Sequence, residues 1–190
     1  LDIKIFEKPG FEADDIIGTI AEHFSNEPGL KIIILSGDLD VLQLVKNDSV
    51  VAEMIKTGVT NTEIYNENKV IERYELKPSQ LPEYKGLVGD ASDNIPGVKG
   101  VGPKSAREVL KEFGNLETVY DNLPIITQKI SKKLEGKKEE ALFYRELATI
   151  KKDVPLQLPQ LRELELKATN PEKLGIFLKS LGFESLLKRL

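Results

Sequence analysis

A continuous run of four apolar residues at positions 32–35, Ile-Ile-Ile-Leu, places the tightest constraint on how this chain folds. Such a run is typical of a strand that is buried on both faces of a parallel sheet. Apolar residues at helical spacing precede it at 13–24, and a short helical pattern at 39–45 separates it from a second strand at 50–55. With a further short strand expected at 3–6, this β-α-β-α-β order predicts an α/β domain built on a largely parallel sheet.

The pattern becomes helical in the second part of the chain, after a short strand expected at 60–65. Apolar residues recur at helical spacing, and prolines and glycines mark where helices begin and end. Asn170 and Pro171 are a favourable N-cap and first residue for a final helix. We therefore expect a helical C-terminal part, with helices at 67–74, 78–88, 103–113, 116–123, 127–150 and from 171 onward.

A glycine-rich turn at positions 97–102 lies between two of these helices. It contains three glycines, which permit positive φ angles and the close approach of another backbone, at Gly97, Gly100 and Gly102. Pro103 suits the first position of a helix. The exposed N–H groups of that helix start, together with Lys104 and Ser105, therefore form a seat for a phosphate. The plainer interpretation is a flexible loop that caps a helix.

Charge is distributed unevenly along the chain. Residues 1–93 contain 9 Lys and Arg against 18 Asp and Glu, a net charge of −9, and residues 94–190 contain 18 against 13, a net charge of +5. Five basic residues lie close together: Lys129, Lys132, Lys133, Lys137 and Lys138. Such a cluster is usually only a solvated helix face, but beside a phosphate seat it also indicates a polyanionic partner.

Seven carboxylates stand at the ends of the predicted elements. They are Glu12, Asp14 and Asp15 at the start of the first helix, Asp38 and Asp40 after the apolar strand, and Asp90 and Asp93 before the glycine turn. Helix capping explains any one group, because acids favour the N-terminal end of a helix. If all three groups converge, they repel one another unless hard divalent cations, Mg²⁺ or Mn²⁺, bind between them. Beside a phosphate seat, two such ions would support hydrolysis of a phosphodiester.

The composition excludes several other kinds of site. The chain has no cysteine and a single histidine, His23. Disulfides and thiolate metal sites are therefore excluded, and zinc enzymes and Ser-His triads are poor candidates. No apolar run approaches the roughly 18 residues that a membrane helix needs. We expect a cytoplasmic protein with no membrane partner.

Four segments, taken in order, resemble a known nuclease family. They are Phe11-Glu12-Ala13-Asp14-Asp15, Ser36-Gly37-Asp38-Leu39-Asp40, Gly89-Asp90-Ala91-Ser92-Asp93-Asn94 and Gly97-Val98-Lys99-Gly100-Val101-Gly102. They are similar to the 5′-nuclease (5′-3′ exonuclease) domain of bacterial DNA polymerase I, in the flap endonuclease superfamily. The resemblance implies a PIN-like α/β core and a helix-three-turn-helix motif. It also implies two-metal cleavage of DNA flaps, nicks or 5′ ends in replication and repair.

The resemblance also assigns roles to residues. It implies catalytic roles, through the metals that they hold, for Asp14, Asp15, Asp38 and Asp40. One ion would be held mainly by Glu12, Asp14 and Asp15, and the other or both by Asp38, Asp40, Asp90 and Asp93. The turn would hold the backbone of double-stranded or flap DNA through Gly97, Lys99, Gly100, Gly102, Lys104 and Ser105, with K⁺ as a candidate ligand of its carbonyls. Residues 1–93 would then be the metal-binding part and 94–190 the helix-three-turn-helix and DNA-binding part.

The sequence departs from this family at its start. The family begins with a strand that ends in a metal-binding aspartate, followed by a second acidic site and a helical arch, and none of these precedes Leu1. We therefore expect an N-terminally incomplete chain that is weakly active or inactive by itself. Its partners would then include the missing segment or an attached polymerase domain.

Two alternatives remain open at this point. One is a non-catalytic fragment that binds duplex DNA through the turn and the basic helices, and metal-dependent cleavage of a flap distinguishes it from a nuclease. The other is a PIN-domain ribonuclease. The glycine turn and the large helical part argue against the ribonuclease, and a preference for single-stranded RNA over branched DNA would favour it.

Overall fold

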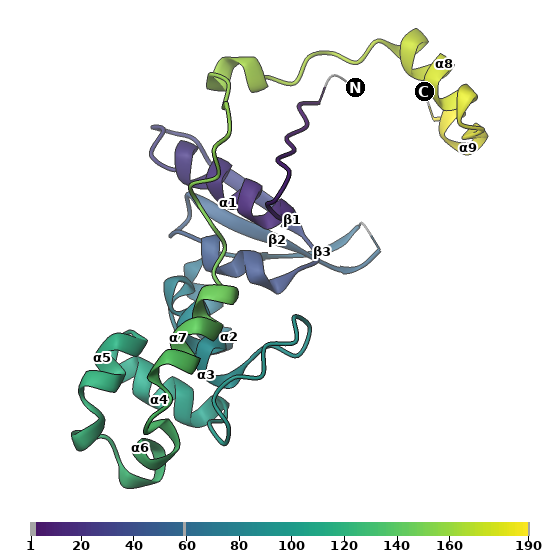
Figure 1. Ribbon diagram of the computed structural model, residues 1–190. Coiled ribbons are helices and arrows are strands. Elements are labelled where there is room, and N and C mark those ends of the chain that lie inside the picture. The colour runs from purple at the N-terminus through teal and green to yellow at the C-terminus, as the bar shows by residue number, and fades with distance from the viewer. Residues whose placement is uncertain (1–2, 59, 190) are drawn as a thin grey trace. The chain divides into compact units, whose positions relative to one another are not determined.

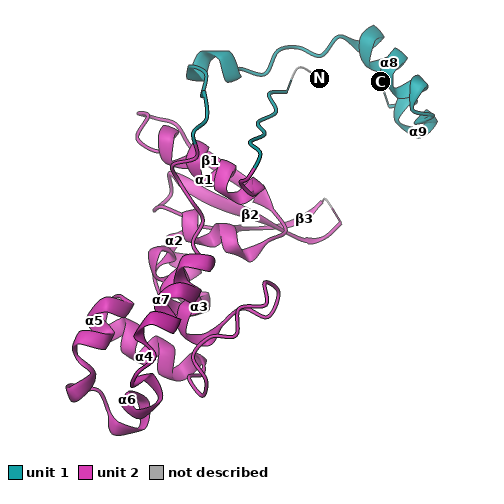
Figure 2. Cartoon of the chain, viewed as in Figure 1, with its two compact units in different colours: residues 1–9, 155–190 teal, residues 10–154 magenta. Residues whose placement is uncertain are grey.

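The computed structural model describes residues 3–58 and 60–189, and the chain divides into two compact units (Figure 2). The larger unit is Gly10–Val154, and the smaller one combines Leu1–Pro9 with Pro155–Leu190. All residues that the sequence predicts to bind metal or DNA belong to the larger unit. Among the described residues, no helix has both the length and the apolar character that crossing a membrane requires.

The N-terminal part of the larger unit contains a small mixed sheet (Figure 1). Strand β1 (Ile32–Ser36) pairs in parallel with β2 (Val50–Thr57), which pairs antiparallel with β3 (Asn61–Tyr65). Helix α1 (Ala13–Phe24) and the 3₁₀ helix η1 (Leu39–Leu44) join the sheet in one hydrophobic cluster. The predicted α/β class is confirmed, with one parallel and one antiparallel strand pair.

The rest of the larger unit is helical, as predicted, and has its own hydrophobic core. Its elements are α2 (Glu67–Tyr74), η2 (Pro78–Gln80), α3 (Leu81–Val88), α4 (Pro103–Phe113), α5 (Leu116–Asp121), η3 (Leu123–Ile125), α6 (Gln128–Leu134) and α7 (Lys138–Leu147). Leu87, Leu110, Leu116 and Leu134, from four different helices, are fully buried in this core. Tyr74 packs against both cores. The division at residue 93, which rests on charge, stays a prediction about function.

The smaller unit contains the 3₁₀ helix η4 (Leu161–Leu164) and two helices, α8 (Pro171–Ser180) and α9 (Glu184–Leu187). The predicted start of α8 is confirmed, because the Asn170 side chain caps the helix by accepting a hydrogen bond from Lys173 N at 3.0 Å.

The structure corrects three sequence expectations. Residues 3–6 form no strand, and this largely exposed segment pairs with no strand in the described part of the chain. Strand β1 is not buried on both faces: Ile33 and Leu35 are 53% and 61% exposed, because the described residues pack only against its Ile34 side. The helix predicted at 127–150 is in fact α6 and α7, with Gly136 at φ +68° between them.

Candidate metal centre

Asp38 and Asp40 lie just beyond the C-terminal end of β1. Ser36 Oγ accepts a hydrogen bond from Asp38 N at 3.0 Å, and Asp38 Oδ1 accepts one from Asp40 N at 2.9 Å. The Asp38 side chain thereby caps η1. Both acids are thus fixed at the end of the strand where open α/β sheets build their sites.

The loop that follows α3 supplies two more carboxylates, Asp90 and Asp93. Two backbone hydrogen bonds close this loop: Asp90 N donates to Ile95 O at 2.7 Å, and Ile95 N donates to Asp90 O at 2.8 Å. Within the described residues, one carboxylate oxygen each of Asp40, Asp90 and Asp93 lies within 4.8 Å of the others. Two segments that are 50 residues apart in sequence therefore form one acidic cluster.

At the start of α1, the Asp15 carboxylate is engaged with the backbone. Its Oδ2 accepts a hydrogen bond from Glu12 N at 3.2 Å, and its Oδ1 accepts one from Lys151 N at 2.8 Å. The segment 148–154 is also held by the buried side chain of Gln43, which donates to one of its carbonyls at 3.1 Å and accepts from one of its amides at 3.0 Å. These bonds fix one wall of a cleft beside the acidic cluster.

The cleft brings the third acidic group to the other two. It has a volume of about 550 Å³, and its acidic lining residues are Glu12, Asp14, Asp15, Asp40, Asp93 and Glu146. Burial raises the pKa of the Asp14 carboxyl, and the nearby charges of Asp38 and Asp40 raise it further. Asp14 therefore faces the acids that follow β1.

Lys85 of α3 forms ion pairs with both Asp40 and Asp90. Burial raises the pKa of Asp40 despite the Lys85 contact, and the charges of Asp38 and Asp90 act in the same direction. Burial also acts to raise the pKa of Asp90, but hydrogen bonds from Lys85 and Ser92 lower it to about 2. Burial acts to lower the pKa of Lys85, and its two carboxylate partners raise it overall.

The donor set fits a hard divalent cation. The side chains that converge are carboxylates, and Mg²⁺ and Mn²⁺ prefer oxygen ligands. The raised pKa values of Asp14 and Asp40 are the electrostatic cost of bringing these acids together, and a bound cation would remove that cost. The identity of the ions, their number and the ligands of each stay predictions.

The glycine turn leads directly from the acidic loop into α4. Gly97 and Gly100 adopt positive φ angles of +67° and +85°, but Gly102 has φ −100° and does not use the left-handed region. A Cβ atom on Gly97 would lie 2.3 Å from Gly89 N, so the turn packs backbone against backbone there. By contrast, a Cβ atom on Gly102 would have no neighbour within 4 Å.

The start of α4 has the features of an anion site. No side chain in the described residues caps this helix, which leaves the N–H groups of Lys104 and Ser105 for another acceptor. Lys133 of α6 donates a hydrogen bond to Gly100 O at 2.6 Å and thereby ties a basic helix to the turn.

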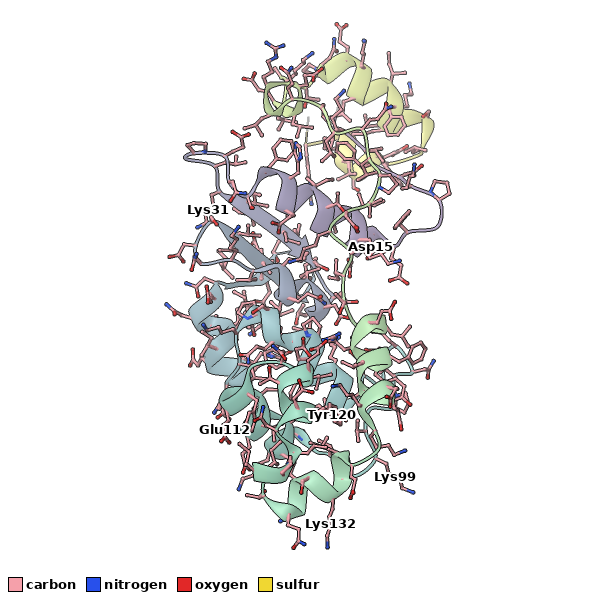
Figure 3. The ribbon with its side chains drawn as sticks, turned by 60° about the vertical axis from the view of Figure 1, so that its left-hand side comes forward. Asp15, Lys31, Lys99, Glu112, Tyr120 and Lys132 are labelled. Atoms are coloured by element: carbon pink, nitrogen blue, oxygen red, sulfur yellow. The ribbon has the colours of Figure 1, made fainter. Side chains whose placement is uncertain are left out.

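The predicted site residues thus lie in two places. The cleft and the acidic cluster beside it contain six of the seven predicted metal ligands, and the charge of the seventh, Asp38, acts on Asp14. The residues of the glycine turn and the start of α4 are not among those that line the cleft. Figure 3 shows Lys99 and Lys132 projecting from the helical end of the larger unit, away from Asp15.

The sequence analysis missed three residues of this site: Lys85, Glu146 and Gln43. Lys85 lies five positions before Asp90, and that spacing was a signal that it faces the same loop. Nothing in the sequence indicated that Glu146 lines the cleft or that Gln43 holds the segment that forms its wall, because both depend on how segment 148–154 docks.

Comparison with known proteins identifies the family. The model of the 5′-3′ exonuclease N-terminal resolvase-like domain matches residues 1–75, and that of the 5′-3′ exonuclease C-terminal SAM fold matches residues 76–172. The chain belongs to the 5′-3′ exonuclease family. The resemblance found in the sequence motifs is therefore confirmed.

Relatives of this 5′-3′ exonuclease family chain are of different lengths. DNA polymerase I of Caldicellulosiruptor bescii is 44% identical over 191 residues, which cover 100% of this chain and 22% of that protein. A 5′-3′ exonuclease of Aquifex aeolicus is 35% identical over 188 residues, which cover 99% of this chain and 62% of that protein. The structure of the T5 D15 protein co-crystallised with metal ions is similar with a TM-score of 0.65 and 27% identity, over 75% of this chain and 51% of that one.

Proposed function

We propose that this chain is the part of a structure-specific 5′ nuclease that binds divalent metal ions and hydrolyses DNA phosphodiesters at flaps, nicks or 5′ ends. The observation that carries the proposal is the convergence of carboxylates from three separate segments on one cleft, in a chain whose acidic loop continues into a glycine turn with an uncapped helix start. The chain spans only part of the length of its relatives, so the activity rests on this geometry and on the family.

The proposed mechanism divides the work between the two places. Asp40, Asp90 and Asp93 would hold one divalent ion, and Asp14 and Asp38 would contribute to holding a second. When bound, such ions supply a hydroxide nucleophile and stabilise the leaving oxygen. The protein keeps the acids in position: the hydrogen bond from Asp40 N to Asp38 and the closed loop around Asp90 prevent the carboxylates from moving apart.

The glycine turn has the second role, that of holding the duplex. The N–H groups of Lys104 and Ser105 and the ammonium groups around the turn contact phosphates, which fixes the position of the DNA without reading bases. The T5 D15 flap endonuclease, a structural relative at 27% identity, has been crystallised with DNA and metal ions. We infer that flap DNA is the substrate of this chain, and that K⁺ is a candidate ligand of the turn carbonyls.

The test is cleavage of a labelled 5′-flap duplex with the chain in excess, which detects the slow turnover that we expect. Cleavage should require Mg²⁺ or Mn²⁺ and stop with EDTA. Asp93→Asn should reduce the cleavage rate by at least about 100-fold. This is more than the loss that usually follows when a residue that only hydrogen-bonds to a metal ligand is substituted. The matched control is Asp48→Asn, because Asp48 precedes β2 at the opposite end of the sheet and its Oδ1 contact with Asn66 can persist.

Two other outcomes would replace this proposal. If the chain binds the flap duplex but cleaves nothing with any divalent ion, it is a duplex-binding module. If it cleaves single-stranded RNA in preference to branched DNA, it is a ribonuclease.

A further inference from the structure

Lys85 lies where a metal ion would be expected. Its ammonium forms an ion pair with Asp40 Oδ1 and lies 2.5 Å from Asp90 Oδ2. These two carboxylates come from opposite sides of the acidic cluster, one after β1 and one after α3. All three side chains are only 16–17% exposed, so water screens these charges weakly.

The same two carboxylates cannot hold both cations well. A divalent ion held by Asp40 and Asp90 would lie close to the Lys85 ammonium and compete with it for these carboxylates, and two cations at such a separation repel each other. Without either cation, the carboxylates would repel each other instead. Lys85 therefore has the position and the charge of an internal counter-ion.

On the basis of the proposed metal centre, we propose that Lys85 is a built-in competitor of the metal. It holds Asp40 and Asp90 together in the metal-free protein, and a divalent ion has to displace its ammonium to bind. Lys85 is a positioning residue on this proposal, because it sets the stability of the empty site and the affinity for the ion.

The surroundings of Lys85 provide a place for the displaced side chain. A cavity of about 290 Å³ borders Lys85, and Tyr74 and Tyr84 are among its lining residues. The cavity gives the long side chain room to leave the carboxylates, and an aromatic side chain can attract the displaced ammonium.

The first measurement is Mn²⁺ affinity at one pH, by calorimetric titration of the full chain. Lys85→Met keeps the length of the side chain but removes the charge, and should bind Mn²⁺ about tenfold more tightly, the effect of one nearby competing charge. Lys85→Arg keeps the charge and should bind Mn²⁺ with nearly the same affinity as the wild type. The matched control is Arg145→Met, because Arg145 likewise bridges two carboxylates, Glu83 and Glu117, but does not line the acidic cleft.

The second measurement is thermal unfolding with EDTA and with saturating Mn²⁺. Lys85→Met should lower the melting temperature in EDTA, and Mn²⁺ should remove most of that difference. Arg145→Met should lower the melting temperature equally in both conditions. An equal loss for Lys85→Met in both conditions would mean that Lys85 is an ordinary structural ion pair, and would overturn the inference.

The third measurement uses the wild-type chain, and so does not depend on how a variant folds. In nitrogen-15 NMR, the Lys85 ammonium should give a resolved, slowly exchanging signal in EDTA that moves or broadens when Mg²⁺ is added. A signal unaffected by bound Mg²⁺ would contradict displacement.

The results separate this inference from the proposed function. If neither the wild type nor Lys85→Met binds Mn²⁺, the proposed metal centre is wrong, and the inference is wrong with it. If the wild type binds Mn²⁺ and Lys85→Met binds no more tightly, only the role of Lys85 is wrong. If Lys85→Met binds Mn²⁺ more tightly than the wild type, and Arg145→Met does not, both are supported.

Discussion

Asp14 and Asp15 are neighbours in sequence, but their carboxylates have different surroundings. Asp15 accepts hydrogen bonds from two backbone amides, those of Glu12 and Lys151, and thereby holds the start of α1 against segment 148–154. Asp14 faces other acids, and burial together with the charges of Asp38 and Asp40 raises its pKa. At the residue scale, Asp15 stabilises the fold, whereas Asp14 destabilises it in the absence of a metal.

Substitution of each acid by Asn should therefore have opposite effects. In EDTA at pH 7, Asp14→Asn should raise the free energy of unfolding by about 0.5–1 kcal/mol, the size of one partly exposed charge interaction. Asp15→Asn should lower it by about 1 kcal/mol, because Asn has one acceptor oxygen for two amide donors. Urea denaturation measures both values, and a loss of stability in Asp14→Asn would contradict the proposed repulsion.

The Asp14 effect should also depend on pH in a defined direction. The pKa of Asp14 is raised above 3.8, so between that value and its raised pKa the folded state binds a proton more readily than the unfolded state does. The destabilisation is therefore complete above the raised pKa and disappears as the pH falls toward 3.8. In EDTA, the stability advantage of Asp14→Asn should vanish over the same range, and a constant advantage down to pH 3.5 would disprove this explanation.

At the scale of elements, local patterns predicted most of the fold and long-range packing decided the rest. Helix α4 was predictable because Pro103, its apolar stripe and Gly114 are all local signals. The exposed face of β1 was not predictable, because the apolar run at 32–35 does not indicate whether one or both faces of the sheet are covered. Likewise, the sequence grouped the seven acids, but the contact between Lys85 and Asp40 depends on how α3 packs near η1.

The glycine turn shows the same limit, because spacing alone made its glycines look equivalent. Gly97 combines φ +67° with backbone contact to Gly89, so Gly97→Ala should lower the free energy of unfolding by about 2–4 kcal/mol through strain and overpacking. Gly102 has φ −100° and open space around it, so Gly102→Ala should change stability by less than about 0.5 kcal/mol. Chemical denaturation tests both variants, and equal effects would contradict this description of the turn.

At the scale of the whole larger unit, the cleft and the glycine turn differ in the charges that surround them. The cleft collects carboxylates, whereas lysines surround the turn and α6. In Figure 3, Lys31 lies toward the sheet and Lys99 and Lys132 lie at the helical end. On the proposed function, a duplex held by its phosphates at the helical end would present one phosphodiester to the metal centre, while the acids repel the rest of the strand.

This separation predicts that DNA affinity and metal affinity can be changed independently. If the start of α4 holds a phosphate, as proposed, Lys104→Ala removes that contact, so it should weaken binding to any duplex sequence about equally and reduce the salt slope of log K by roughly one unit. Lys31→Ala is the matched control, because Lys31 is also exposed but lies toward the sheet, and it should leave the salt slope unchanged. Fluorescence anisotropy on two unrelated duplexes at several salt concentrations, with Mn²⁺ titration of each variant, provides the measurement.

Lys104→Ala should bind Mn²⁺ as the wild type does, since Lys104 does not line the acidic cleft. A loss restricted to one duplex sequence, or an unchanged salt slope, would show that the start of α4 does not bind the DNA backbone.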